Sequence, residues 1–256
     1  MQDDFKPNGG SRPRLDQLLV DRGLFPTRSR ARDAVTRGTV RVDGKPATKA
    51  GMLVAADAKV DVDDPASAYV SRAALKLIAG LDHFGIDVKS RTALDIGAST
   101  GGFSQVLLER GAAHVVAVDV GHDQLHESLR SDPRVTNHEG LNARTLERIH
   151  LGGRKIDLVV SDVSFISLKL ALPPALGLAE AGSHCMLLVK PQFEVGREGI
   201  GKGGLLRDPA DGERVADELA VWLATQPGWR ALGLCPSPIE GGDGNREYLL
   251  AGIKDQ

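Results

Sequence analysis

The sequence has few of the features that mark secreted, membrane or metal-binding proteins. It contains only two cysteines, Cys185 and Cys235, too few for a disulfide framework or a zinc ribbon. None of its apolar stretches approaches the roughly 20 residues that a bilayer-spanning helix needs. The N-terminus MQDDFKPNGG is polar and unlike a signal peptide, and the seven histidines show no spacing typical of metal ligands. A cytoplasmic protein without a metal centre is therefore expected.

A strong net charge is also absent, since 32 Lys and Arg stand against 34 Asp and Glu. With 41% hydrophobic residues, the composition excludes both a disordered chain and a uniformly basic nucleic-acid coat. The charge is nevertheless uneven. Residues 1–62 contain 12 basic and 8 acidic residues, whereas residues 63–256 contain 20 and 26. Because basic segments attract phosphate groups, the N-terminal segment is a candidate for nucleic-acid binding, although most charged segments are merely solvated.

The basic segment 11–62 has the pattern of a compact helix–helix–hairpin unit. Apolar stripes predict two short helices, the second starting after the N-cap residue Thr27. The residues expected to be buried are Leu15, Leu18 and Leu19 in the first helix and Ala31, Ala34 and Val35 in the second. Alternating valines followed by the dipeptide Asp-Gly at 43–44 predict a strand and a tight turn.

The order of these elements, with the strings RLDQLL, RSRARDAV and GTVRVDGKPATKAG, resembles the RNA-binding domain named after ribosomal protein S4. In that family the second helix and the following loop contact structured RNA. The resemblance implies that RNA is a partner and that its phosphates are contacted by Arg14, Arg28, Arg30 and Lys45.

Beyond this unit the composition changes twice. Residues 63–70 include Pro65, acids and small residues, which indicates a linker. Residues 71–256 begin with a helical pattern and continue with apolar strand-like runs that alternate with helical ones. The residues that fall largely on one side of the first helix are Leu75, Ile78, Ala79 and Leu81. The alternation predicts an α/β fold whose mostly parallel sheet is covered on both faces.

The most informative local pattern is LDIGASTGGFSQVLLERG at 94–111. An apolar strand ends at Asp95, a glycine-rich turn follows, and a helix begins near Gly102. The next apolar run ends at Asp119, where a carboxylate suits the ribose hydroxyls of a nucleoside cofactor. A dinucleotide site is one interpretation, although the turn lacks GxGxxG. A hydrolase elbow with Ser99 as nucleophile is another, but it needs a later Asp and then His, and His184 is the last histidine.

A third interpretation rests on the spacing D-x-G-x-x-x-G, followed by an acidic residue after the next strand. This pattern resembles the signature of class I methyltransferases. The resemblance implies S-adenosylmethionine as the cofactor, and the residues that it places at the cofactor are Asp95, Gly97, Ser99, Gly101, Asp119, Asn142 and Asp162.

Four polar residues stand out in this part of the chain: Lys76, Asp162, Lys190 and Glu247. Lys76 lies on the helix expected before the first strand. Asp162 and Lys190 end apolar strands and Glu247 enters the last one, and side chains at the carboxyl ends of parallel strands line ligand crevices. A Lys after MLLV is costly to bury without a partner, but each of the four, taken alone, can also be a solvated residue. Together with SRAALK, DVSFISLK and LVKPQFE, they resemble the Lys-Asp-Lys-Glu tetrad of FtsJ-like ribose 2′-O-methyltransferases.

The chain as a whole, from about Arg12 to Ile253, resembles the TlyA family, whose members are named as hemolysins and as ribosomal RNA 2′-O-methyltransferases. The resemblance implies ribose methylation of ribosomal RNA, with cytidine as the base. In this scheme Lys190 is the general base, Asp162 orients it, Lys76 stabilises the developing alkoxide, and Glu247 holds the lysines or the ribose. Two other functions stay open: an RNA-binding assembly factor without catalysis, and a membrane-active hemolysin.

Overall fold

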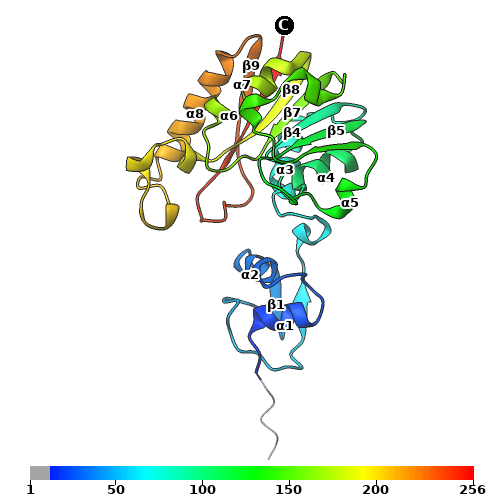
Figure 1. Ribbon diagram of the computed structural model, residues 1–256. Coiled ribbons are helices and arrows are strands. Elements are labelled where there is room, and N and C mark those ends of the chain that lie inside the picture. The colour runs from blue at the N-terminus through cyan, green and yellow to red at the C-terminus, as the bar shows by residue number, and fades with distance from the viewer. Residues whose placement is uncertain (1–11) are drawn as a thin grey trace, which may run out of the picture. The chain divides into compact units, whose positions relative to one another are not determined.

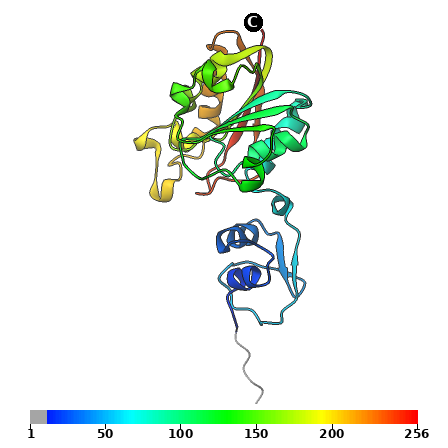
Figure 2. The ribbon, with the colours of Figure 1, turned by 45° about the vertical axis from the view of Figure 1, so that its right-hand side comes forward.

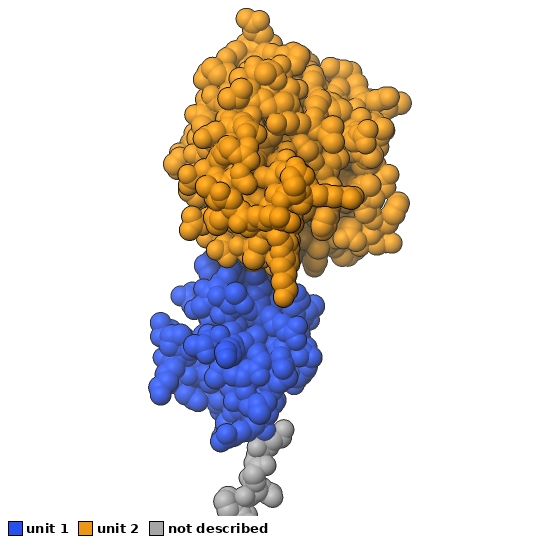
Figure 3. Space-filling model, turned by 90° about the vertical axis from the view of Figure 1, so that its left-hand side faces the viewer, with its two compact units in different colours: residues 1–68 blue, residues 69–256 orange. Residues whose placement is uncertain are grey.

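The computed structural model describes residues 12–256, which divide between residues 68 and 69 into two compact units (Figure 3). The polar segment that argues against a signal peptide and Ser11, where the basic unit is expected to begin, lie outside the described residues. Within residues 12–256, no helix is long and apolar enough to cross a membrane.

The first unit has two helices, α1 (Leu15–Asp21) and α2 (Arg28–Thr36). An antiparallel sheet of order β2–β1–β3 accompanies them, with strands β1 (Val40–Val42), β2 (Lys45–Pro46) and β3 (Val60–Val62). A 3-10 turn, η1 (Pro65–Ala68), follows β3. The predicted helix–helix–hairpin order is confirmed, and all six residues expected in its two apolar stripes are buried. Thr27 caps α2 as predicted, because its Oγ1 accepts a hydrogen bond from Arg30 N at 3.3 Å.

The second unit is built on a seven-stranded sheet of order β6–β5–β4–β7–β8–β10–β9 (Figure 1). Strands β4 to β8 pair in parallel, and β10 runs antiparallel to both of its neighbours, so the predicted mostly parallel α/β sheet is confirmed. Sequence analysis did not single out β9. The strands are β4 (Thr92–Ile96), β5 (His114–Val118), β6 (Val135–His138), β7 (Ile156–Ser161), β8 (Ala179–Val189), β9 (Trp229–Pro236) and β10 (Tyr248–Lys254).

Helices cover both faces of this sheet (Figures 1 and 2). One apolar cluster contains residues of α3, α4 and α5, and the other contains residues of α6, α7 and α8. Neighbouring strand residues such as Ala93 and Leu94 enter opposite clusters, as the two-residue period of a strand requires. The helices are α3 (Ala74–Phe84), α4 (Gly102–Glu109), α5 (Glu127–Arg130), α6 (Leu168–Ala171), α7 (Pro173–Leu178) and α8 (Asp211–Ala224). Short 3-10 turns connect them: η2 (Ala143–Thr145), η3 (Arg148–Leu151), η4 (Pro191–Phe193), η5 (Arg197–Gly199) and η6 (Lys202–Gly204).

Helix α3 differs from the prediction in the face that it buries. Leu75, Ile78 and Ala79 are only partly buried, whereas Lys76 is 5% exposed. Of the four residues expected on one side of the helix only Leu81 is buried, and the pattern of apolar residues could not show that the buried face includes Lys76. Its ammonium pairs with the buried carboxylate of Glu247, which lies immediately before β10.

Candidate active site

Three parallel strands end together at the site. Asp119 follows β5 and Asp162 follows β7, while the glycine-rich turn follows β4. The turn is held between its neighbours, because Gly97 N donates to Val118 O at 2.8 Å and Asp162 N donates to Ile96 O at 3.0 Å. The carboxyl ends of β4, β5 and β7 therefore form one continuous edge.

Two positions in the turn require glycine. Gly97 has φ +81°, and a Cβ there would lie 3.0 Å from the carbonyl oxygen of Asp162. Gly101, which caps α4, has φ +99°, and a Cβ there would lie 2.2 Å from Leu129 Cδ1. Larger residues would be strained at both positions, so the close approach of the turn to its neighbours depends on these glycines.

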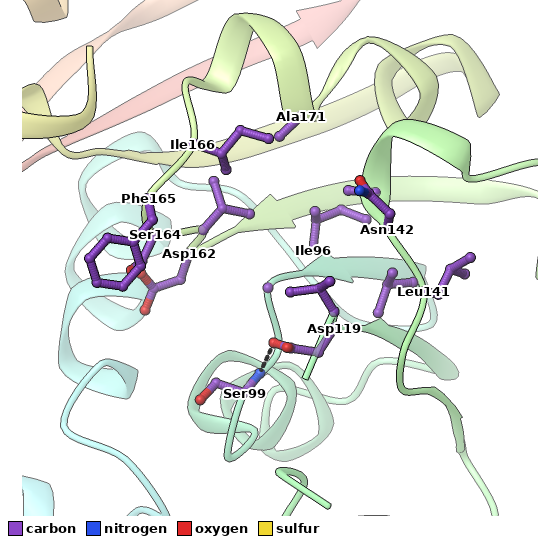
Figure 4. Close-up of a pocket in the computed structure, with 15 residues that line it drawn as sticks. Ile96, Ser99, Asp119, Leu141, Asn142, Asp162, Ser164, Phe165, Ile166 and Ala171 are labelled. Carbon is purple, nitrogen blue, oxygen red and sulfur yellow. Dashed lines mark hydrogen bonds between the residues drawn. The ribbon is translucent and has the colours of Figure 1, made fainter. Parts of the chain in front are cut away.

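A cavity of about 490 Å³ opens at this edge (Figure 4). Asp162, Ser164 and Phe165 lie on one side of it, and Leu141 and Asn142 lie on the other. The residues predicted to contact a cofactor that line this cavity are Gly97, Ser99, Asp119, Asn142 and Asp162. No histidine lines the described cavity, so a hydrolase centred on Ser99 would lack its base here.

The Asp119 carboxylate is fixed by the backbone. Its Oδ2 accepts a hydrogen bond from Ser99 N at 2.8 Å (Figure 4). Its Oδ1 accepts one from Gly121 N at 2.7 Å. Each carboxylate oxygen has a further lone pair, so Asp119 can still accept hydrogen bonds from a bound molecule.

Asp95 and Gly101 do not line the cavity, although both were predicted at the cofactor. Asp95 is fully buried, and its Oδ2 accepts a hydrogen bond from Ser104 Oγ at 2.7 Å. Burial raises the pKa of Asp95 to about 7, against the opposing effect of the Ser104 hydrogen bond. Asp95 and Gly101 therefore contribute to the conformation of the turn and not to the wall of the cavity.

The four residues predicted as a tetrad form two ion pairs. Lys190 Nζ lies 2.6 Å from Asp162 Oδ1 and donates a hydrogen bond to Ser164 Oγ at 2.7 Å. Lys76 Nζ donates to Glu247 Oε2, and both of these side chains are buried. Burial raises the pKa of the Glu247 carboxyl, and Lys76 opposes this effect. Each of the four residues thus has a partner of opposite charge.

A second cavity, of about 530 Å³, adjoins the first. Lys190 and Glu247 line it, and Ser164 and Phe165 line both cavities. Because Asp162 lines the first cavity and Lys190 the second, their ion pair lies where the two cavities meet. A molecule in each cavity would bring its reacting group to this pair.

Sequence analysis missed Phe165. This residue is 89% exposed, has a left-handed backbone with φ +64°, and packs its ring 5.0 Å from that of Phe193. A non-glycine residue in this conformation costs about 1–3 kcal/mol and is typical of functional sites. The available signal was an aromatic residue three positions after the strand-end Asp162.

The basic residues predicted to contact RNA lie in the first unit. Arg14 and Arg28 both form ion pairs with Asp16, and Arg30 Nη2 donates to Ala66 O at 2.9 Å. Lys45 is exposed on β2. Three of the four thus also have intramolecular partners. The part of the chain that the structure describes contains no cluster of side chains that could hold a metal ion.

Comparison with known proteins identifies the family. Residues 69–254 match the model described as FtsJ-like methyltransferase, and residues 13–60 match the S4 domain. The chain is 49% identical over 241 residues to the Mycobacterium tuberculosis protein named 16S/23S rRNA (cytidine-2′-O)-methyltransferase TlyA, which covers 93% of this chain and 89% of that protein. The chain belongs to the TlyA family of FtsJ-like methyltransferases.

Two other similar proteins have a different name. Hemolysin A of Brachyspira hyodysenteriae is 37% identical, with 92% of this chain and 98% of that protein covered. A solved structure of a Streptococcus thermophilus protein, titled as a hemolysin, superposes with a TM-score of 0.74 at 39% identity, covering 95% of this chain and 89% of that one. The predicted enzyme class, methyltransferase, is confirmed by family membership, which excludes the dinucleotide and hydrolase interpretations of the turn.

Proposed function

We propose that this methyltransferase transfers a methyl group from S-adenosylmethionine to a ribose 2′-hydroxyl of ribosomal RNA, on a cytidine, in the cytoplasm. The Asp162–Lys190 ion pair at the junction of two cavities supports the proposal most directly. The names of the relatives supply the substrate class and the base.

The first cavity fits the cofactor. Its volume is in the usual range for small-molecule sites, roughly 300–1,000 Å³. Val118 and Leu141 provide apolar walls for a purine, and Asp119 offers a fixed carboxylate for ribose hydroxyls. Asp162, which pairs with Lys190 of the second cavity, presents a negative charge that suits a cationic sulfonium. When bound, S-adenosylmethionine supplies an activated methyl group.

Lys190 is the residue that we assign as proton acceptor. A ribose hydroxyl is a weak nucleophile at neutral pH, so the reaction needs a positioned base. Lys190 lines the second cavity, and its Nζ pairs with Asp162 and donates a hydrogen bond to Ser164 Oγ. In its neutral form, the amine can take the hydroxyl proton while these two partners keep the nitrogen in place. General-base catalysis of this kind contributes about 10²–10⁴-fold.

In this scheme Lys76 and Glu247 contribute electrostatically: Lys76 stabilises the charge that develops in the reaction, and Glu247 balances the charge of Lys76. The buried Lys76 ammonium lies beside Glu247, which lines the second cavity, and there it stabilises the negative charge that develops on the ribose oxygen. Glu247 compensates Lys76 while no substrate is bound, since an unpaired buried charge would be costly.

In this proposal the two units have different functions. We assign RNA binding to the basic segment 11–62, with Arg14, Arg28, Arg30 and Lys45 as contacts, and methyl transfer to residues 71–256. Phe165 adds an exposed aromatic ring beside both cavities, and bases stack on such rings irrespective of sequence.

Mapping ribose methylation by mass spectrometry tests this function. Ribosomal RNA from cells with the gene is expected to contain a 2′-O-methylcytidine that RNA from cells without it lacks. Supplying the Lys190→Ala variant is expected to leave the site unmethylated. Identical maps with and without the gene, despite binding to ribosomal subunits, would instead support an assembly factor without catalysis.

A further inference from the structure

Asp16 is a fully buried carboxylate surrounded by arginines. Its Oδ1 accepts a hydrogen bond from Arg14 Nε at 3.1 Å, and its Oδ2 accepts from Arg28 Nη2 at 3.0 Å and Arg32 Nε at 2.8 Å. Sequence analysis did not single out Asp16 or Arg32. The three arginines and the one carboxylate form a group with a net charge of +2.

The backbone sets this arrangement. Arg28 and Arg32 stand one turn apart on α2, so their side chains leave the helix on the same face. Arg14 is the N-cap residue of α1, and Asp16 N is held by a hydrogen bond to Ala50 O at 2.8 Å. Gly51 leaves room for Arg14, because a Cβ at position 51 would lie 2.7 Å from Arg14 Nη2.

Asp16 stays ionised in the interior, whereas the three arginine side chains that it binds reach the surface. The Arg14 hydrogen bond, with those of Arg32 and Arg28, holds the pKa of Asp16 well below its usual range, against the effect of burial. The three arginine side chains remain 48%, 44% and 54% exposed. Among the contacts of residues 12–256, Arg28 and Arg32 each direct one nitrogen to Asp16, and a guanidinium has five N–H donors.

We propose that Asp16 is a positioning residue for RNA binding, which fixes the guanidinium groups of Arg14 and Arg28, already assigned as phosphate contacts, and that of Arg32, which joins them as a third contact to the RNA backbone. The inference rests on the proposed function only in taking RNA as the substrate. Guanidinium groups suit phosphate because their paired N–H donors match its oxygens. Fixing them before binding lowers the conformational entropy lost in the complex.

The sharpest test removes a negative charge and predicts weaker RNA binding. Asp16→Asn and Asp21→Asn each make α1 more basic by one charge, but Asp21 is an exposed residue that accepts a hydrogen bond from Gln17. If only net charge mattered, both variants would bind ribosomal subunits as tightly as the wild type or more tightly. We expect Asp16→Asn to bind roughly tenfold more weakly, because an amide cannot hold three mutually repelling guanidinium groups.

Salt dependence separates this role from a merely structural one. Each phosphate contact contributes about 0.7–0.9 to the slope of log K against log salt. Using subunits purified from cells that lack the gene, we expect Asp16→Asn to lower this slope by at least about one contact. Cofactor affinity, measured by calorimetry on the same samples, is expected to stay at the wild-type value.

A second variant keeps the test decisive if Asp16→Asn destabilises the first unit. Arg32→Gln leaves Asp16 with two guanidinium partners and is expected to lower the salt slope by about one contact. Lys59→Ala, which removes an exposed charge outside the group, is the control.

Binding of folded Asp16→Asn that equals that of Asp21→Asn would overturn the proposal, and so would an unchanged slope for Arg32→Gln. If the wild-type protein itself fails to bind subunits, the RNA assignment in the proposed function fails instead.

Discussion

Asp162 and Lys190 follow neighbouring parallel strands, β7 and β8, and their side chains meet at 2.6 Å at the carboxyl edge of the sheet. Asp162 lines the first cavity, and Lys190 lines the adjoining one. Parallel pairing of the two strands produces this meeting, since strands that run in the same direction end at the same edge.

Asp119 is expected to determine cofactor affinity. In Asp119→Asn the side chain keeps its size, but one acceptor becomes a donor and the charge is lost. Charge-assisted hydrogen bonds contribute about 1.5–3 kcal/mol, so the dissociation constant for S-adenosylmethionine should rise roughly 10- to 150-fold in calorimetry. Asp123→Asn, in the same loop with its side chain 92% exposed, is the matched control. Equal affinities in the two variants would show that the cofactor lies elsewhere.

Asp95 is expected to make stability depend on pH. Its pKa is about 7 in the folded protein, above its ordinary value, so between about pH 4 and pH 7 the folded state binds a proton that the unfolded chain has lost. Stability therefore falls as pH rises through this window, by at most about 1.4 kcal/mol per pH unit.

The comparison of wild type with Asp95→Asn isolates this contribution. Urea unfolding followed by the fluorescence of Trp222 and Trp229 reports on the second unit, which contains both tryptophans. The variant should show a shallower decline in stability between about pH 4 and pH 7 than the wild type does. Parallel pH curves for the two proteins would mean that Asp95 does not titrate in this range.

The Lys76–Glu247 pair is expected to show strong coupling in a double-mutant cycle. Lys76→Met alone leaves Glu247 buried without its partner, and removing one member of a buried pair costs about 3–5 kcal/mol. Lys76→Met combined with Glu247→Leu replaces the pair by apolar side chains and should recover much of that loss in urea unfolding. Additive effects of the two changes would contradict an energetically coupled pair. The double variant should be inactive in methyl transfer.

Phe165 is expected to act on RNA and not on the cofactor. Stacking on an aromatic ring contributes about 1–3 kcal/mol per base, so Phe165→Ala should lower kcat/KM for ribosomal subunits roughly 5- to 150-fold. Cofactor affinity should not change. Leu170→Ala, which truncates another exposed apolar residue, serves as the control. A Phe165→Ala enzyme with wild-type kcat/KM would remove the stacking assignment.

The sequence predicts positions that follow from regular periodicity. Strand ends such as Asp119, Asp162 and Lys190 were correctly placed after β5, β7 and β8, because each closes a mainly apolar, strand-like run. The buried face of α2 was also predicted correctly, from the helical spacing of its apolar residues.

Features that depend on tertiary contacts could not be predicted from the sequence. Lys76 can be buried because it forms an ion pair with Glu247, which is distant in the sequence. No local sequence pattern reveals this pairing. From the sequence, Asp16 resembles a solvated acidic residue in a basic segment. It is buried because α1 and α2 pack against each other in the fold. Asp95 fits a cofactor motif by spacing, yet its carboxylate turns into the core.

The most direct test of the account is single-turnover methyl transfer to purified ribosomal subunits by the wild type, Lys190→Ala and Lys190→Arg. A guanidinium stays protonated and cannot accept the hydroxyl proton, so both variants are expected to lose at least about 100-fold in rate while still binding cofactor and subunits. An arginine variant that transfers the methyl group at nearly the wild-type rate would contradict Lys190 as the base and leave it only an electrostatic role.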